Sequence, residues 1–421
     1  MTDQPIAATH PAQGGVTAAR GFRASGVHAG FRKDPERLDL ALVVADEPCA
    51  CAAVFTKNVF CSAPVIVSRA QLGADQPGEP AYGTARAVVV NSGNANAATG
   101  EPGLEAARET ARIAGDAVGC PASEVLVAST GVIGVQLPLA PFGIGLPAAA
   151  SLLSAGGGAD AARAIMTTDT VKKELAVTVA IGGQKVTIGA IAKGSGMIHP
   201  NMGTMLCFLT TDCAITQEML QDALHDIVPR TFNRVTVDGD TSTNDMCVIL
   251  ANGMAENPLI EWKDDNYTVF FKALSEICTE LARSIAADGE GASRLVTCTV
   301  MDARSEESAE RLAKAVVGSS LVKAAMFGAD ANWGRVLCAM GYSGAEFDPE
   351  TVDVSFGSVV GEVTVCRQGA GLDFDEDQAK SILSQDEVVI EVDLHEGEHQ
   401  ATCWGCDLTY DYVKINGEYR T

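Results

Sequence analysis

Short apolar runs bounded by turn residues dominate the hydrophobic pattern of this chain of 421 residues. Runs of this kind predict buried strands, and they occupy residues 38–45, 87–91, 125–127, 205–209, 231–238, 246–251, 295–301, 351–365 and 387–394. Apolar residues at helical spacing predict helices over residues 104–118, 217–227 and 268–287. Residues 174–192 alternate around Gly182 and Gly183, which predicts a β-hairpin with a two-residue turn.

The order of these elements decides the expected fold class. The strands do not alternate one for one with helices, as parallel βαβ units require, so a doubly wound sheet is not expected. We predict an α+β fold in which two sheets and their covering helices stack as a layered sandwich. A chain of this length can bury a large core, as one large domain or as two to three average ones.

Residues 193–212 carry the strongest candidate chemistry. The stretch reads KGSGMIHPNMGTMLCFLTTD, so glycine and proline break regular structure before Gly203 and Thr204, and an apolar run follows at once. A threonine hydroxyl in this position can attack the preceding carbonyl and cut the backbone. The cut leaves a new N-terminus that carries both a nucleophile and an amine base. The ordinary alternative is a Gly-Thr turn that enters a sheet.

A second corner follows the predicted strand at 125–127. Gly131 permits a tight turn after Ser129 and Thr130, and adjacent backbone amides at such a turn can point at one oxygen atom. Acyl transfer through Thr204 needs donors of this kind for its oxyanion. The alternative is a plain strand-to-helix turn.

A Ser-His-Asp triad is the competing route to acyl transfer. The chain has six histidines but no Gly-x-Ser-x-Gly nucleophile elbow. His199 lies close to Thr204 in sequence and is a candidate base. A freed Thr204 amine titrates near neutrality, however, and can accept the hydroxyl proton without a histidine.

Composition and charge exclude several classes of partner. Aromatic residues make up 5% of the chain and the net charge is −24, and both argue against a nucleic-acid-binding protein. Residues 204–421 hold 38 acidic residues against 15 basic ones, which a solvated surface explains better than attraction of cationic substrates. No apolar run reaches the roughly 20 residues that a membrane-spanning helix needs.

Cysteines and acidic clusters give little sign of a metal. The 13 cysteines are scattered and no secretory signal begins the chain, so we expect reduced thiols in a cytoplasmic protein. Cys403 and Cys406 lack the second pair of a structural zinc site. The octet DGDTSTND at 238–245 lacks the glycine and final glutamate of a calcium loop and predicts a hydrogen-bonded turn near the site. We expect no metal and no bound cofactor.

Ordered blocks of uncommon residue combinations run along nearly the whole chain. Together they resemble the ornithine acetyltransferases of arginine biosynthesis, also called glutamate N-acetyltransferases. The blocks are GGVTAARGFRASGVHAG at 14–30, AVFTKN at 53–58, NSGNANAATG at 91–100, STGVIG at 129–134, TTDT at 167–170, KGSGMIHPNMGTML at 193–206, TFNRVTVDGDTSTND at 231–245, DGEGA at 288–292, GADANWGR at 328–335 and YVKINGEYRT at 412–421.

This resemblance implies an αββα-type core, similar to that of other self-processing N-terminal-nucleophile hydrolases but connected differently. It implies cleavage between Gly203 and Thr204 into chains 1–203 and 204–421, which fold together as one catalytic unit. Two such pairs are implied to form a heterotetramer. The implied reaction carries the acetyl group of N2-acetylornithine through Thr204 to glutamate in a ping-pong scheme. Acetyl-CoA is an implied second donor in bifunctional members.

The resemblance also assigns roles to individual residues. Oxyanion stabilisation falls to Thr130 and Gly131. Lys193 offers a cation, Glu290 can meet the ornithine ammonium, and the chain end supplies polar contacts. The full set of implied substrate contacts is Thr167, Lys193, Thr204, Glu290, Asn416 and Thr421.

Two positions depart from the family pattern. Gly203 stands where alanine is usual, and because both residues are small we expect cleavage to survive. Ala331 stands where proline is usual, which softens a turn. The sequence alone leaves two other functions open: a self-processing aminopeptidase or amidase that passes the acyl group to water, and a non-catalytic amino-acid-binding protein whose chain stays intact.

Overall fold

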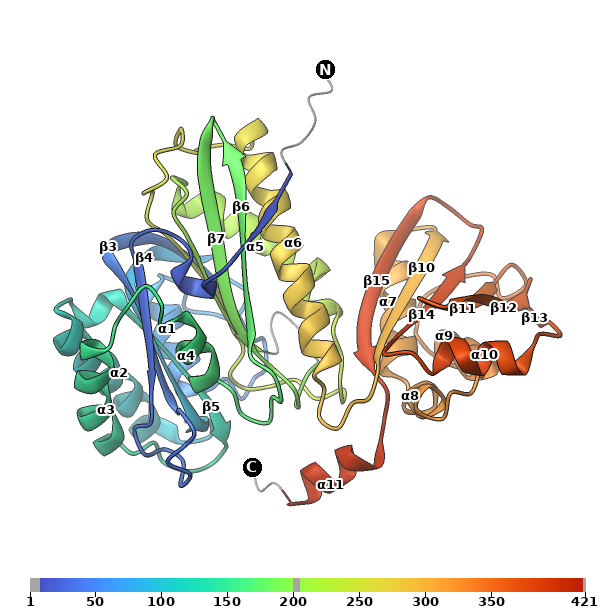
Figure 1. Cartoon of the computed structure of the whole chain (residues 1–421), viewed down its shortest axis with the longest axis horizontal. Coiled ribbons are helices and arrows are strands. Elements are labelled where there is room, and N and C mark those ends of the chain that lie inside the picture. Colours follow the sequence, from blue (N-terminus) through green and yellow to red (C-terminus); the bar gives the residue numbers. More distant parts are fainter. Residues whose placement is uncertain (1–7, 200–204, 419–421) are drawn as a thin grey trace.

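The computed structural model describes residues 8–199 and 205–418, and two bodies lie side by side in it (Figure 1). The larger body holds a nine-stranded sheet. Its strands are β1 (His10–Ala12), β2 (Phe22–Val27), β3 (Leu40–Phe55), β4 (Ala81–Asn94), β5 (Val125–Val132), β6 (Lys173–Ile181), β7 (Gln184–Lys193), β8 (Leu206–Thr211) and β9 (Met246–Ala251). Its helices are α1 (Ala63–Gln71), α2 (Gly100–Val118), α3 (Ala140–Ser151), α4 (Gly158–Ala164), α5 (Gln217–Arg230) and α6 (Asp265–Ala287).

The nine-stranded sheet folds back on itself along β3. The strand order is β1-β6-β7-β8-β9-β3-β4-β5, with β2 as a branch on β3. The first part of β3 pairs with β2, whereas residues 50–55 pair with β9. A register shift between Val44 and Cys49 in the β3–β4 ladder separates the two parts, and irregularities of this kind bend a strand. One continuous sheet therefore supplies two layers.

Alternation of side chains along the strands defines these layers. Leu40 belongs to a buried cluster with α2 and α3, whereas Ala41 belongs to a second cluster that also contains Phe208 of β8. Leu209, the next residue of β8, faces a third cluster with α5 and α6. Helix, sheet, sheet and helix stack in that order (Figure 1). The αββα sandwich predicted from the sequence is confirmed.

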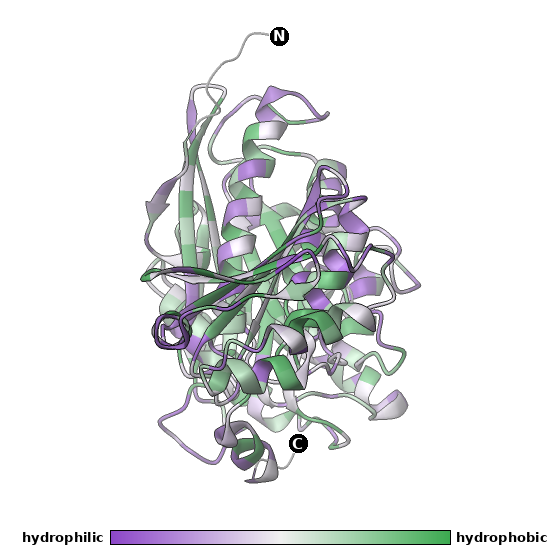
Figure 2. Ribbon diagram, turned by 90° about the vertical axis from the view of Figure 1, so that its right-hand side faces the viewer, coloured by the Kyte–Doolittle hydropathy of each residue, from purple (hydrophilic) through white to green (hydrophobic). Residues whose placement is uncertain are grey.

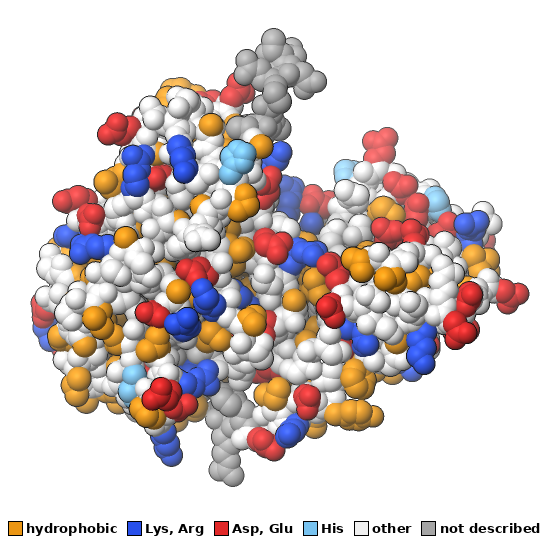
Figure 3. Space-filling view, in the orientation of Figure 1, with side chains coloured by type: hydrophobic (Ala, Val, Ile, Leu, Met, Phe, Trp, Pro, Cys, Tyr) orange, Lys and Arg blue, Asp and Glu red, His pale blue; other side chains and the backbone are white. Residues whose placement is uncertain are grey.

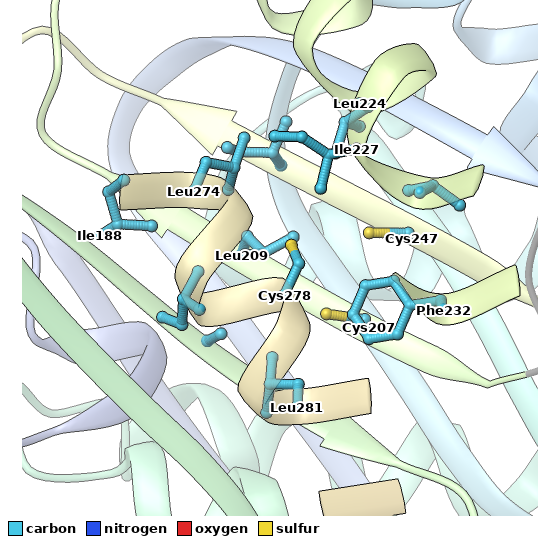
Figure 4. Close-up of a cluster of buried hydrophobic side chains, with 14 of the residues drawn as sticks. Ile188, Cys207, Leu209, Leu224, Ile227, Phe232, Cys247, Leu274, Cys278 and Leu281 are labelled. Carbon is cyan, nitrogen blue, oxygen red and sulfur yellow. The ribbon is translucent and has the colours of Figure 1, made fainter. Parts of the chain in front are cut away.

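Strands β8 and β9 are buried at every residue because both of their faces are covered. Figure 4 shows one of these faces, where Cys207, Leu209 and Cys247 lie against Leu274 and Cys278 of α6. In Figure 2, where the ribbon is coloured by hydropathy, the central strands have the colour of apolar residues. Since β7 pairs with β8, the described residues on the two sides of the predicted cut share one sheet.

The smaller body, residues 295–406, is built on a separate six-stranded sheet of order β13-β12-β11-β14-β10-β15. Its strands are β10 (Leu295–Ala303), β11 (Asp353–Ser358), β12 (Gly361–Arg367), β13 (Ala370–Gly371), β14 (Glu387–Asp393) and β15 (His399–Cys406). Its helices are α7 (Glu306–Gly318), α8 (Ser320–Phe327), α9 (Trp333–Gly341) and α10 (Glu376–Leu383). Acidic side chains are numerous on its surface (Figure 3).

Most of the predicted elements are confirmed, with boundaries extended by a few residues. The hairpin forms as β6 and β7 around Gly182 and Gly183. The Thr216 side chain caps α5 by accepting a hydrogen bond from Met219 N (3.4 Å). The run at 351–365 contains two strands, β11 and β12, that pair as an antiparallel hairpin.

The strand predicted at 231–238 is wrong. Residues Phe232–Arg234 form a 3-10 turn, and the alternating Val235 and Val237 are buried without joining a ladder. They lie in a connection held by single backbone bonds, such as Val237 N to Ile198 O (2.7 Å). Helix α11 (Tyr410–Glu418) follows β15 and is the last described element.

Two global expectations concern cysteines and membranes. All thirteen cysteines lie in described residues and are free. Among the residues that the structure describes, no helix combines the length and the apolar character needed to cross a membrane.

Candidate active site

A cavity of about 130 Å³ opens where the ends of β5 and β7 meet α11. It brings together every described residue to which the family resemblance gave a role: Thr130, Gly131, Thr167, Lys193, Glu290 and Asn416. The remaining three residues, Gly203, Thr204 and Thr421, lie outside the described residues. A smaller cavity next to it is lined by Met205 and Leu206, the first residues described after the predicted cut.

Thr130 and Gly131 form a corner at the end of β5. At the second of these two positions only glycine fits. Gly131 has a φ of +131°, which residues with a side chain rarely adopt. A Cβ at this position would lie 2.4 Å from the carbonyl carbon of Gly93 in β4. The close passage of two strands, rather than turn geometry alone, therefore explains the glycine.

The edge of β5 fixes where its backbone groups point. Val127 exchanges two hydrogen bonds of 2.8 Å with Ser68 Oγ, so its N–H and C=O point away from β4. Val132 O accepts from Ala95 N (2.9 Å), toward β4. Backbone groups alternate direction along a strand, so Gly131 N–H points to the outer edge while Thr130 N–H points toward β4.

Lys193 ends β7 with its ammonium in the cavity. Its Nζ lies 3.5 Å from Thr130 Oγ1, to which it donates. Burial lowers the pKa of Lys193 below its usual range, and the nearby Asp169 carboxylate opposes that shift. A cation with a depressed pKa inside a cavity is typical of functional sites.

Asp169 is the buried centre of the TTDT block. Its carboxylate accepts from Thr167 N (3.0 Å), Gly194 N (2.8 Å) and Lys173 Nζ (2.8 Å). Burial alone would raise the pKa of Asp169, but Lys193 and Lys173 outweigh burial and hold it at about 2. One carboxylate thus positions two segments of the cavity wall, at Thr167 and next to Lys193.

A second carboxylate, Asp288, extends this network toward the other side of the cavity. It accepts from Lys173 Nζ (2.6 Å) and from Thr170 N (3.1 Å). Two residues later, Glu290 lines the cavity, and its backbone N–H bonds Ser195 O (3.1 Å). The buried ion pairs therefore connect the lysine and glutamate sides of the site.

Glu290 and Asn416 meet between the two bodies. Asn416 Nδ2 of α11 donates to Glu290 Oε2 (2.7 Å). Gly196 faces the carboxylate so closely that a Cβ there would lie 2.2 Å from Glu290 Cδ. Helix α11 itself is fastened by Tyr412 OH, which donates to Asp238 Oδ2 (3.5 Å).

The sequence analysis missed the residues of the DGDTSTND turn that line the cavity. The turn was predicted to lie near the site, and Ser242, Thr243 and Asn244 confirm this by forming part of its wall. Asn244 donates to Ser129 O (2.8 Å) and Ala95 O (2.6 Å). The polar composition of the octet was a signal, but it did not single out Asn244.

His199 is held away from this constellation. Its Nδ1 is paired with Thr236 Oγ1 at 3.0 Å, and it is not part of the cavity wall. Burial, helped by the Lys314 ammonium, lowers the pKa of His199 to about 4. The geometry gives no support to His199 as the base.

Comparison with known proteins identifies the family. A sequence model of the ArgJ family matches residues 23–421. The chain belongs to the ArgJ family. It is 52% identical over 409 residues to the arginine biosynthesis bifunctional protein ArgJ of Symbiobacterium thermophilum, covering 97% of this chain and 99% of that protein. It is 45% identical over 420 residues to the protein of the same name from Geobacillus kaustophilus, covering 100% and 99%.

Two solved structures align with parts of the chain. A crystal structure of the bifunctional protein ArgJ from Bacillus halodurans is 48% identical, covers 50% of this chain and 98% of its own, and has a TM-score of 0.48. Ornithine acetyltransferase from Mycobacterium tuberculosis, solved as a complex with ornithine, is 38% identical with a TM-score of 0.41, covering 46% and 99%.

Family membership confirms the resemblance seen in the sequence. The protein is an enzyme of arginine biosynthesis that transfers acetyl groups, as the ArgJ relatives are. The departure at Ala331 is compatible with the fold, because this residue is buried beside α9 in the core of the smaller body.

Proposed function

We propose that this ArgJ protein moves the acetyl group of N2-acetylornithine to glutamate through an acetyl-enzyme on Thr204. The observation that carries the proposal is the convergence of Thr130, Gly131, Lys193 and Glu290 on one cavity. Donors for an oxyanion, a cation for a carboxylate and an anion for an ammonium are what this exchange needs from a single pocket.

The chemistry begins with cleavage of the backbone between Gly203 and Thr204: the Thr204 hydroxyl displaces the Thr204 nitrogen from the Gly203 carbonyl carbon, and water then hydrolyses this ester to a Gly203 carboxylate and a free Thr204 hydroxyl and amine. The freed Thr204 amine then takes the proton of the Thr204 hydroxyl, whose oxygen bonds to the acetyl carbon. The carbon–nitrogen bond to ornithine breaks, and the proton passes to the departing nitrogen. In the second half, the amine of glutamate attacks the ester carbon, the ester bond to Thr204 Oγ breaks, and the proton lost by the attacking amine passes through the Thr204 amine to Thr204 Oγ.

Two donors stabilise the oxyanion in both halves of the reaction. Gly131 N–H lies on the free edge of β5, and Thr130 offers its hydroxyl, since its N–H points toward β4. Lys193, which donates to Thr130 Oγ1, orients that hydroxyl. Removal of one such donor from an enzyme typically lowers kcat about 100- to 1,000-fold.

Shared recognition lets two amino acids use the same pocket in turn. Lys193 binds the α-carboxylate that ornithine and glutamate have in common. Glu290 attracts the side-chain ammonium of ornithine, and Asn416 keeps the Glu290 carboxylate oriented. We further propose that Thr421 contributes from the chain end, that acetyl-CoA serves as a second donor, and that two 1–203 and two 204–421 chains form a heterotetramer.

Mass and kinetics test this proposal together. Untagged, denatured protein should give two masses whose junction lies between Gly203 and Thr204, and a Thr204→Ala variant should give one. Initial rates with acetylornithine and glutamate should give parallel double-reciprocal plots. Intersecting plots, or activity in an uncut chain, would contradict the mechanism. Hydrolysis of acetylornithine that is indifferent to glutamate would instead identify an amidase.

A further inference from the structure

Asn244 lies at the free edge of β5, where the oxyanion donors are presented. The residue is 6% exposed. Both amide hydrogens are used on the ends of adjacent strands, one on Ser129 O of β5 (2.8 Å) and one on Ala95 O after β4 (2.6 Å). Its Oδ1 accepts from Thr243 Oγ1 (2.6 Å), which fixes the orientation of the amide.

The position of these bonds relative to Gly131 gives them a consequence. Ser129 O and Gly131 N–H point to the same outer edge of β5, two residues apart. On this edge Ser68 bonds Val127 and Asn244 bonds Ser129, so Gly131 N–H is the next group in the series. Among the residues that the structure describes, β5 has no further strand beyond it, and the side chains of Ser68 and Asn244 take the place of one.

We propose that Asn244 is a positioning residue for oxyanion stabilisation: its amide holds the end of β5 so that Gly131 N–H points into the cavity. This inference rests on the proposed function. The same hydrogen bonds would join the two chains after cleavage, because Asn244 lies after Thr204 while Ser129 and Ala95 lie before it.

Two substitutions separate this role from space filling. Asn244→Asp keeps the size of the side chain but places a carboxylate against two carbonyl oxygens, which repel it. Asn244→Ala removes both donors and leaves room for water to bond the carbonyls. A positioning role predicts that Asp lowers the acetylation rate more than Ala, whereas space filling predicts the reverse order.

The experiment measures one half-reaction of the processed protein. Release of ornithine from acetylornithine in a single turnover, normalised to the processed chain by intact mass, should slow about 10- to 100-fold in Asn244→Asp. The Kd of ornithine should change less than about threefold, because the amide has no hydrogen left for a ligand. A rate like that of the wild type in Asn244→Asp, or equal losses in rate and affinity, would overturn the inference.

Two further sets of variants provide a control and an alternative test. Asn257 is a matched control: it is 5% exposed, bonds Ala214 O (3.1 Å) and Pro258 O (2.8 Å), and lies outside the cavity wall. Asn257→Asp should lower Tm while the acetylation rate of the folded protein is kept; an equal loss of rate would make the effect of Asn244→Asp a general one.

If Asn244→Asp does not fold or is not cut, the hydroxyl that orients the amide can be removed instead. Thr243→Val should slow acetylation with little change in ornithine affinity, and Thr243→Ser, which keeps the donor, should lose less; equal rates would overturn the inference. Failure of the proposed function has a different signature, because wild-type protein would then form no acetyl-enzyme at all.

Discussion

The two bodies of the molecule bury their strands in different ways. Every residue of β8 in the larger body is buried, whereas β14 in the smaller body alternates between buried and half-buried residues. The reason is the number of layers. β8 lies between helices and a second sheet layer, while in β14 the buried residues Val388, Ile390 and Val392 all belong to one cluster.

The burial of ion pairs also differs between the two bodies. Lys173 and Asp169 pair with side chains that are at most 1% exposed, at the edge of the cavity. On α7 of the smaller body, Arg311 and Glu307 pair at 2.8 Å with both side chains largely in solvent. The larger body therefore holds a buried ion pair at the site in addition to exposed pairs such as Arg112–Glu109 on α2, and the smaller body holds many charges at its surface (Figure 3).

The largest expected effects test the layers themselves. Phe208→Ala and Leu209→Ala, at consecutive positions of β8, should each lower the free energy of unfolding by about 2–5 kcal/mol, because each residue fills a different fully buried cluster. In β14, Ile390→Ala should cost a similar amount but Val389→Ala less than about 1 kcal/mol. Urea denaturation measures all four. Equal losses at Val389 and Ile390 would contradict the description of β14 as a strand that is buried on one face only.

The layers were predictable from sequence, because a strand buried on both faces must be apolar throughout and the run at 205–209 is. The segment at 231–238 shows the limit. Val235 and Val237 alternate with polar residues as in a half-buried strand, yet Arg234 and Thr236 are buried too, and the segment bonds Trp404 and Ile198 only through single backbone hydrogen bonds. Local alternation therefore does not reveal which backbone groups find a strand as their partner.

The site was predictable mainly through the family resemblance, which named six residues that the cavity brings together. Asn244 was not, because its function depends on two carbonyl groups more than a hundred positions away in sequence. Asp169 was missed for a different reason. Its three donors come from a loop, the start of β6 and the residue after β7, and a single acidic residue in a polar block does not reveal them.

The buried ion pairs should dominate the acid response of the larger body. The pKa of Asp169 is about 2 in the folded protein, against about 3.9 in an unfolded chain. A depressed pKa adds stability above the unfolded value, and this stability is lost as the pH falls from about 4 to about 2. Asp169→Asn should remove about 2 kcal/mol at pH 7 and flatten the stability profile in this window.

Thermal and urea unfolding between pH 2 and 7 measure this effect. The matched change in the smaller body is Arg311→Ala, which should cost no more than about 0.5 kcal/mol because the pair is exposed. If the loss of stability below about pH 4 is unchanged in Asp169→Asn, other carboxylates control the acid response of the larger body.

Two glycine-to-alanine substitutions compare the site with the smaller body. In Gly196→Ala the new Cβ would meet the carboxylate of Glu290, so the glutamate must move. The affinity for ornithine should fall about tenfold, or about 1.4 kcal/mol, with little change in Tm, since only the end of a flexible side chain is displaced. In Gly341→Ala, in α9 of the smaller body, the new Cβ meets nothing within 4 Å. Calorimetric titration with ornithine should not distinguish this control from the wild type.

The smallest expected effect concerns α11, through which the smaller body reaches the site. Asn416→Ala removes the donor to Glu290 Oε2 but leaves the anchor of Tyr412 on Asp238 in place. Because a hydrogen bond to a charged group is replaced by water at an exposed position, the ornithine Kd should rise only about three- to tenfold. Val413→Ala, at a 70% exposed position of the same helix, is the control. Equal affinities in the two variants would mean that α11 covers Glu290 without orienting it, and the contribution of the smaller body to the pocket would then be steric.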